Sequence, residues 1–290
     1  MSRLKISAIS YLNTAPLMWD FEHREASADQ AADLVADYDI SYTIPSACAE
    51  ALRAGTADVG IIPAAAYATV PDLVILPDVA IAARRAVRSI LLVSKMPSKR
   101  PGDPLSKQSP WAQVRTVALD TSSMTSVALA KILFAKWLGG ARDYKAMAPD
   151  LEAMLEACDA ALLIGDPALQ IDRTRYFTLD LAEEWVARTG KSFVFAFWAI
   201  RKPALAGRSG AAIAEVFKKS RDHGLSPDKI EAIAQEWAPR LGLTVEFVRV
   251  YLTHNIHYYL DPPCLEGLAL YYRLGAEIGA FPQAPELRFV

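Results

Sequence analysis

The chain has 290 residues, of which 52% are hydrophobic and 22% charged, enough for one large domain or two medium ones. Its 31 basic and 33 acidic side chains give a net charge of -2, so no basic excess indicates a nucleic acid or an anionic membrane surface as partner. Its three cysteines lie far apart without a CxxC or Cys/His cluster, so neither a disulfide framework nor a zinc site is predicted.

The first element is an apolar run, Leu4–Ile9, which predicts a buried strand. The segment that follows, Ser10–Leu17, has polar residues suited to capping a helix and a proline suited to a first helical turn. The side chains of Ser10, Tyr11 and Asn13 therefore fall at the carboxyl end of a strand, where open α/β sheets bind ligands. An ordinary strand-to-helix turn would show the same local pattern, since capping residues are common.

Short apolar runs alternate with helical stretches through most of the chain, which indicates an α/β fold. The last of these runs is long and apolar enough to be buried on both faces. The segment 97–110 holds four prolines among Lys, Arg, Ser and Gly, which predicts a linker or an exposed insertion. After the first strand, strands are predicted at 39–43, 59–62, 74–76, 79–82, 89–94, 116–119, 160–164, 176–179 and 192–200.

From residue 203 onward only helices are predicted. A helical tail cannot form a sheet of its own, so we expect it to pack onto an earlier one. A weak repeat relates 45–64 to 149–168, since each has a proline-started helix, an aspartate, an apolar strand and then a proline with small residues. The repeat indicates two α/β lobes of similar build. The helices of the tail are predicted over 209–223, 226–237, 244–259 and 262–278.

These patterns predict a bilobed α/β clamshell, with two mixed-sheet lobes, a ligand cleft and a helical carboxyl-terminal segment. Lobe I is expected to comprise residues 1–91 plus 200–290, and lobe II residues 92–199. The chain would cross between the lobes near 89–94 and 197–201. A ligand in the cleft would contact strand ends and helix starts of both lobes.

Helix amino termini bind anions through free N–H groups and the helix dipole. The chain offers such starts at Asn13-Thr14, at Pro45-Ser46 and at 121–126, where five of six residues carry hydroxyls. Two or three of these sites facing one cleft suit a small ligand with two carboxylates. Serine and threonine cap helices in most proteins, so any single cap is explained equally well by structure alone.

Few other polar residues are candidates for the binding site. Arg88 follows two other arginines and precedes Ser89, so it could supply positive charge or lie in a solvated turn. Asp166 ends an apolar strand, where a carboxylate can orient a helix start or a backbone N–H. His254 and His257 lie on one helical face, but no carboxylate motif accompanies them and we expect no metal. The chain has no nucleophile motif, phosphate loop or dinucleotide fingerprint, which favours a site without a cofactor.

The stretch Ile9–Leu17 closely resembles the signature of the chorismate dehydratases of the futalosine route to menaquinone. Further pieces agree in order along the chain, at 45–49, 55–63, 88–89, 121–126 and 193–198. The resemblance covers essentially the whole chain. It implies the fold of the type II periplasmic binding proteins and a cytoplasmic enzyme that works without a cofactor.

The resemblance also implies a reaction, the conversion of chorismate to 3-[(1-carboxyvinyl)oxy]benzoate with loss of water. By position within the motifs, the catalytic residues would be Asn13 and Ser89. None of the candidates is a convincing general base at neutral pH, so we expect the side-chain carboxylate of the substrate itself to take the proton. The residues expected to bind this dicarboxylate are Ser10, Tyr11, Ser46, Arg88, Ser123, Thr125, Ser126 and Asp166.

Three other functions fit part of the pattern. A non-catalytic solute-binding protein of the same fold would bind small anions, but no apolar signal segment precedes Leu4, which favours a cytoplasmic protein. The sister enzyme that forms 1,4-dihydroxy-6-naphthoate shares the fold but lacks the opening motif. The effector domain of a transcription regulator would need a DNA-binding segment. No apolar run approaches the ~18 residues of a membrane span, and the pattern predicts no oligomeric state.

Overall fold

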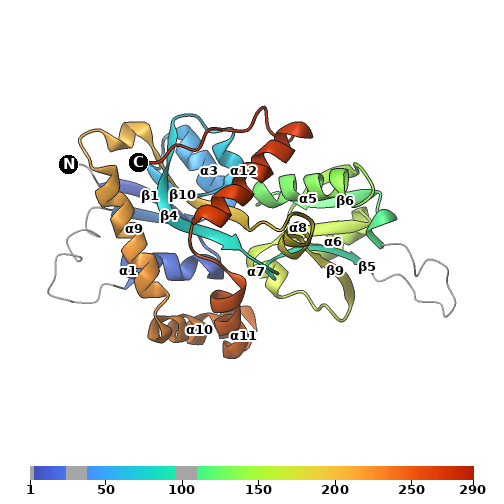
Figure 1. Ribbon diagram of the computed structural model, residues 1–290. Coiled ribbons are helices and arrows are strands. Elements are labelled where there is room, and N and C mark those ends of the chain that lie inside the picture. The colour runs from blue at the N-terminus through green and yellow to red at the C-terminus, as the bar shows by residue number, and fades with distance from the viewer. Residues whose placement is uncertain (1–2, 24–37, 96–109) are drawn as a thin grey trace.

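Two five-stranded mixed sheets form the framework of the protein (Figure 1). The computed structural model describes residues 3–23, 38–95 and 110–290. In the first sheet, β1 pairs in parallel with β2 and β3, while β10 runs antiparallel between β3 and β4. The order across this sheet is β2 (Tyr38–Thr43), β1 (Leu4–Ile9), β3 (Val59–Pro63), β10 (Phe193–Arg201) and β4 (Leu73–Ala83).

The second sheet repeats this plan. β6 pairs in parallel with β7 and β8, and β5 runs antiparallel between β8 and β9. We call the parts of the chain built on the first and second sheets lobe I and lobe II, and the predicted α/β fold of two mixed-sheet lobes is confirmed. The order across the second sheet is β7 (Asp143–Met147), β6 (Thr116–Asp120), β8 (Ala160–Ile164), β5 (Ile90–Lys95) and β9 (Tyr176–Asp180).

The helical tail packs onto the first sheet, as expected for helices without a sheet of their own. Helix α9 contacts β4, and α12 contacts β10. In Figure 1 the green and yellow helices of lobe II lie together on one side, and α12 reaches across to α5. Within the described ranges no helix has the length and apolar character needed to span a bilayer. The helices of lobe I and of the tail are α1 (Trp19–Glu22), α3 (Pro45–Ala54), α4 (Ala64–Tyr67), α9 (Gly210–Gly224), α10 (Pro227–Leu241), α11 (Val245–Val250) and α12 (Pro262–Glu277).

Lobe II carries its own helices, and short segments of tighter or wider helix complete the fold. Asp150 and Asp180 cap α6 and α8 by accepting backbone N–H groups of the first turn, the usual role of aspartate before a helix. The helices of lobe II are α5 (Thr125–Lys136), α6 (Leu151–Ala157), α7 (Gly165–Leu169) and α8 (Leu181–Thr189). The short segments are the 3₁₀ turns η1 (Leu12–Met18), η3 (Pro110–Ala112) and η4 (Lys202–Leu205) and the π turn η5 (Tyr251–Asn255).

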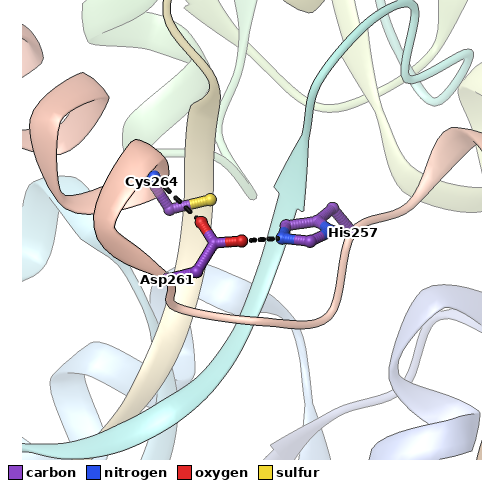
Figure 2. A group of neighbouring side chains, drawn as sticks. All are labelled: His257, Asp261 and Cys264. Carbon is purple, nitrogen blue, oxygen red and sulfur yellow. Dashed lines mark hydrogen bonds and ion pairs between the residues drawn. The ribbon is translucent and has the colours of Figure 1, made fainter.

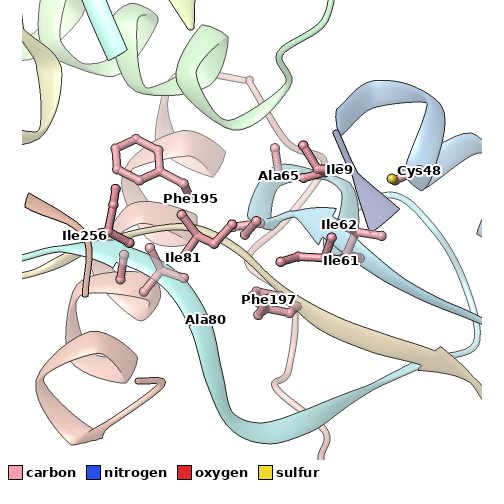
Figure 3. Close-up of a cluster of buried hydrophobic side chains, with 14 of the residues drawn as sticks. Ile9, Cys48, Ile61, Ile62, Ala65, Ala80, Ile81, Phe195, Phe197 and Ile256 are labelled. Atoms are coloured by element: carbon pink, nitrogen blue, oxygen red, sulfur yellow. The ribbon is translucent and has the colours of Figure 1, made fainter. Parts of the chain in front are cut away.

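Strand β10 lies in the core of lobe I. Its residues from Phe193 to Ile200 are all buried, which confirms the prediction of a strand buried on both faces. Figure 3 shows Phe195 and Phe197 of this strand near Ile61 of β3 and Ile81 of β4. Full burial of each such side chain contributes about 1.5–3 kcal/mol to the free energy of folding. The same core supplies one wall of the cavity described below.

Several boundaries differ from the predicted ones. The runs at 74–76 and 79–82 form one continuous strand, β4, whose register against β10 shifts at two points. Strand β7 is not predicted because most of its side chains are polar or exposed. The helix predicted over 244–259 ends in the π turn η5, after which the chain is extended. The predicted loop at 97–110 lies outside the described residues, apart from its last residue.

The two passages between the sheets bracket lobe II. The chain leaves the first sheet after β4 and enters the second at β5, so the first crossing covers 84–89, beside the predicted 89–94. The return occurs before Phe193, because β10 pairs along its length with β3 and β4. This differs from the return predicted near 197–201, which placed residues 193–199 in lobe II. A strand buried on both faces has the same apolar sequence pattern in either sheet, so the pattern does not identify its lobe.

A close backbone approach fixes η1 against α9. A Cβ on Gly224, at the end of α9, would lie 2.0 Å from the Pro16 carbonyl oxygen, so only glycine fits there. The Ser220 hydroxyl of α9 also donates to the Leu17 carbonyl at 2.9 Å. The segment that carries Asn13 is therefore held by the helical tail as well as by β1.

Candidate active site

A small cavity of about 50 Å³ is lined by residues of both lobes. Its apolar wall includes Ile9, Ile81 and Phe195, which belong to the core of Figure 3. Its polar groups come from the segment after β1 in lobe I and from the start of α5 in lobe II. The lining residues are Ile9, Tyr11, Asn13, Pro45, Pro63, Ile81, Ile90, Ser123, Thr125, Ser126, Ile164, Gly165, Phe195 and Ala196.

The cavity brings together half of the residues predicted for the site. Those that line it are Tyr11, Asn13, Ser123, Thr125 and Ser126. Their roles in binding or catalysis stay predictions, but their proximity agrees with a cleft between strand ends and helix starts. The predicted residues that do not line the cavity are Ser10, Ser46, Arg88, Ser89 and Asp166.

Asn13 and Thr14 do not cap a helix as expected. Helix η1 begins at Leu12, with Tyr11 at the cap position and no capping bond from its side chain. Asn13 therefore lies in the first turn, where its side chain reaches the cavity. Ser10 lies before this turn, is exposed, and places its hydroxyl 3.4 Å from the Thr43 carbonyl oxygen.

Thr125 joins the two lobes across the cavity. Its hydroxyl donates to the Phe195 carbonyl at 3.0 Å and accepts the Ala65 N–H at 3.1 Å, and both partners belong to lobe I. The Tyr271 hydroxyl of α12 donates to the Thr125 carbonyl at 3.1 Å. The buried Thr125 hydroxyl thus already donates to one group and accepts from another. The Ser46 N–H likewise donates across the lobes, to the Ser122 carbonyl at 3.1 Å.

Tyr11 packs against lobe II at a position that requires glycine. A Cβ on Gly165 would lie 2.5–2.9 Å from the Tyr11 ring, and Gly165 has a φ of +63°. The Tyr11 hydroxyl lies 3.4 Å from the Ser122 hydroxyl, which donates to the buried Asp120 carboxylate at 2.6 Å. Asp120 also accepts the Ser122 N–H at 2.8 Å. The polar stretch at 121–126 therefore begins as a turn built around Asp120, and α5 starts only at Thr125.

Asp166 caps the first turn of η1 from the opposite lobe. Its carboxylate accepts the Leu12 N–H at 3.0 Å, which confirms the expectation that it orients a backbone N–H at a helix start. Burial raises the pKa of this carboxyl to about 6, against the opposing effect of the Leu12 N–H. Any contact of Asp166 with a substrate stays a prediction.

Ser89 is fully buried just before β5, beside the cavity-lining Ile90. Its carbonyl accepts the Gly165 N–H at 2.8 Å, and its hydroxyl accepts the Tyr251 hydroxyl at 2.9 Å. Burial raises the pKa of the Tyr251 hydroxyl, and both Ser89 and Asn13 are close enough to oppose that rise. Sequence reasoning missed Tyr251, because a lone tyrosine in a helical tail carries no signal that relates it to the opening motif.

The passage from β4 to β5 is held in an unusual conformation before Ser89. Arg88 has a φ of +65°, in the left-handed region that favours glycine. The buried Asp180 carboxylate accepts the N–H groups of Val87 and Arg88, at 3.2 and 2.6 Å. The Arg88 guanidinium lies over the Phe247 ring, 5.2 Å from its centroid, and does not line the cavity. Its predicted contact with a carboxylate therefore gains no support from this arrangement.

Among the described residues, His257, Asp261 and Cys264 form the one group with metal-ligand chemistry (Figure 2). Asp261 caps α12 by accepting the Cys264 N–H at 3.1 Å, contacts the His257 ring at 2.8 Å and also pairs with Arg84. Burial raises the pKa of the Cys264 thiol to about 12, so the thiol stays protonated. The Arg84 guanidinium is already paired with the Asp261 carboxylate. We therefore interpret the group as a structural link between the end of β4 and the start of α12.

The chain belongs to the menaquinone biosynthesis family, whose family model matches residues 4–277. It is also similar to the chorismate dehydratase of Thermus thermophilus, with 29% identity over 264 residues, which cover 85% of this chain and 88% of the relative. The resemblance carried by the opening segment is therefore confirmed at the level of the family.

The fold is that of the periplasmic binding proteins. The periplasmic aliphatic sulphonate binding protein of Escherichia coli matches with a TM-score of 0.63 at 18% identity, covering 99% of this chain and 94% of the other. A protein of Archaeoglobus fulgidus matches with a TM-score of 0.70 at 16% identity, covering 96% of this chain and 98% of that one. A Candida albicans protein with the generic periplasmic binding protein fold gives 0.67 at 11% identity, covering 98% and 92%. These likenesses confirm the expected fold.

The raised pKa of Asp166 predicts a stability that depends on pH. Because its value of about 6 in the folded protein exceeds the ordinary 3.8, the folded state binds this proton more tightly than the unfolded chain. The resulting stabilisation is complete below about pH 4 and is lost as the pH rises through 6. In urea denaturation, the free energy of unfolding of Asp166→Asn, relative to that of the wild type, should rise by about 2 kcal/mol between about pH 4.5 and about pH 7.5.

Asp159→Asn is the matched control for this experiment. Hydrogen bonds from Thr116 and Arg115 lower the pKa of the Asp159 carboxyl, so it is ionised throughout this pH range. The stability difference between Asp159→Asn and the wild type should therefore stay level. An equally level difference for Asp166→Asn would show that its pKa is not raised.

The left-handed backbone at Arg88 predicts an unequal effect of two small substitutions. Both Arg88→Gly and Arg88→Ala remove the contact with Phe247, but only glycine relieves the conformation. We expect Arg88→Gly to be the more stable variant by about 1 kcal/mol in thermal or urea denaturation. If Arg88→Ala proves equally stable, the backbone at this position is not strained.

Proposed function

We propose that this protein is a chorismate dehydratase, which removes water from chorismate to give 3-[(1-carboxyvinyl)oxy]benzoate. The observation that carries the proposal is that Asn13 and the hydroxyl-rich start of α5, from opposite lobes, line one cavity in a member of the menaquinone biosynthesis family. The similarity to the Thermus thermophilus chorismate dehydratase supports the same reaction. We place this reaction in the futalosine route and class the enzyme as a hydro-lyase.

The reaction is driven by the substrate, so the protein need not supply a reactive group of its own. Removal of the proton at C3 and the hydroxyl at C4 forms a new carbon–carbon double bond and makes the ring aromatic. The C3 proton is activated through the ring double bond conjugated to the ring carboxylate. Hydrogen bonds to that carboxylate would stabilise the negative charge that develops on it, and the cleft would hold the substrate in a reactive orientation.

The start of α5 is suited to bind one of the two substrate carboxylates. Ser123, Thr125 and Ser126 line the cavity there, and the first turn of a helix has N–H groups and a dipole that favour an anion. Asn13 faces the same cavity from lobe I and would contact the reacting ring. Ser89 does not line the cavity but directly precedes the lining residue Ile90, and it would assist departure of the hydroxyl by donating a hydrogen bond to it.

We propose that the proton removed from C3 is accepted by the side-chain carboxylate of the substrate itself. The described residues that line the cavity include no carboxylate, histidine or lysine. Asp166 has a pKa of about 6, close to that of a useful base, but its carboxylate accepts the Leu12 N–H and lies outside the lining. The reaction so described needs no metal ion or cofactor.

A binding protein without catalysis is the second candidate. The fold shared with the sulphonate binding protein favours it, since that protein holds its ligand in the same architecture. Tight binding of chorismate without conversion would support this alternative.

The direct test is to incubate the protein with chorismate and follow an aromatic product, lighter by one water, by absorbance and mass spectrometry. We expect turnover by the wild type and a loss of at least about 100-fold for Asn13→Ala and Ser89→Ala, because each removes a hydrogen bond to the reacting groups. Thermal denaturation and circular dichroism would confirm that both variants fold.

Ser94→Ala provides a matched control in the same part of the chain. Ser94 lies on β5, and its hydroxyl donates to the carbonyl of Lys95, away from the cavity-lining residues. This variant should keep wild-type turnover. A fully active Asn13→Ala variant would overturn the assignment of the site.

A further inference from the structure

Tyr251 is a buried residue whose hydroxyl lies next to both residues expected to carry the reaction. Its side chain is 1% exposed, and its O–H donates to the Ser89 hydroxyl oxygen at 2.9 Å. Asn13 lies close enough to the same hydroxyl to lower its pKa. The tyrosine belongs to the helical tail and therefore brings a third part of the chain to the site.

The direction of this hydrogen bond determines what Ser89 can do. A serine hydroxyl has one O–H to donate and two lone pairs to accept with. The Tyr251 O–H is the more acidic of the two hydroxyls and therefore the better donor, so with Tyr251 donating to the Ser89 oxygen the proton of Ser89 is left to donate elsewhere. The donated bond also polarises the serine O–H and makes it a stronger donor. Without Tyr251 the serine hydroxyl would be free to rotate.

The π turn that carries Tyr251 is fixed to the same passage between the lobes as Ser89. Asn255, at the end of this turn, donates from its side chain to the Ala86 carbonyl at 2.9 Å. Tyr251 and Asn255 therefore hold the segment 84–89 at two points. Asp180 holds the intervening backbone at Val87 and Arg88. Single π turns often occur at functional sites, because the extra residue redirects side chains.

We propose that Tyr251 is a positioning residue that acts through Ser89, orienting and polarising the serine hydroxyl so that its proton is donated to the substrate. This proposal rests on the proposed function, in which Ser89 assists departure of the substrate hydroxyl. Tyr251 acts through Ser89, because its hydroxyl is bonded to the Ser89 hydroxyl at 2.9 Å.

Tyr251→Phe tests this role because it removes the hydroxyl and leaves the ring. We expect kcat for chorismate to fall about tenfold with KM nearly unchanged, since the lost hydrogen bond orients a donor and does not bind the substrate. A tyrosine that only filled space would leave kcat unchanged. The same substitution in a Ser89→Ala background should cause no further loss, measured in single-turnover experiments that follow slow variants.

Tyr258→Phe is the matched control. Tyr258 is also buried, at 2% exposure, and lies seven positions further along the chain, but its hydroxyl has no hydrogen-bond partner among the described residues. We expect its kcat to equal that of the wild type. Removal of an unpaired buried hydroxyl should also leave the protein at least as stable.

The outcomes separate this role from the proposed function. A wild-type protein that does not convert chorismate overturns the proposed function, and the role of Tyr251 with it. A wild type that converts chorismate while Tyr251→Phe is equally fast overturns the role of Tyr251 alone. So does an undiminished loss in the Ser89→Ala background, or an equal loss in Tyr258→Phe.

Discussion

The cavity depends on hydrogen bonds in which side chains of lobe II satisfy backbone groups of lobe I. Asp166 accepts the Leu12 N–H, and Thr125 accepts the Ala65 N–H while donating to the Phe195 carbonyl. A buried N–H or carbonyl left without a partner costs about 1–3 kcal/mol, so these contacts strongly favour one arrangement of the lobes. That arrangement places groups from both lobes around a single cavity. The site is thus a consequence of how the lobes meet.

The helical tail contributes more than cover for the first sheet. Gly224 lets α9 approach the backbone of η1, and η1 carries Asn13. The π turn after α11 brings Tyr251 to Ser89, on the passage from lobe I to lobe II. The two residues predicted to be catalytic are therefore supported by the same carboxyl-terminal segment. Such support from packed helices is what a reaction that relies on orientation requires.

The sequence was most informative where function and local pattern coincide. The segment Ile9–Leu17 and the hydroxyl-rich stretch at 121–126 both reach the cavity. Apolar runs predicted the strands other than β7, and the internal repeat predicted the two lobes. The tertiary contacts of single residues could not be predicted from local sequence patterns. Arg88 appeared as a charge for a carboxylate, but Asp180 and Phe247 hold its backbone and side chain elsewhere. Tyr251 had no local signal, because its partner lies 162 positions away.

We expect chorismate to bind between the lobes, with its ring against Asn13 and one carboxylate at the start of α5. A crystal structure of the Asn13→Ala variant with chorismate tests this binding mode, because that variant should bind chorismate without converting it. We predict intact chorismate in the cavity, with a carboxylate near Ser123 and Ser126. Chorismate bound outside the cavity, or with both carboxylates directed away from α5, would contradict it.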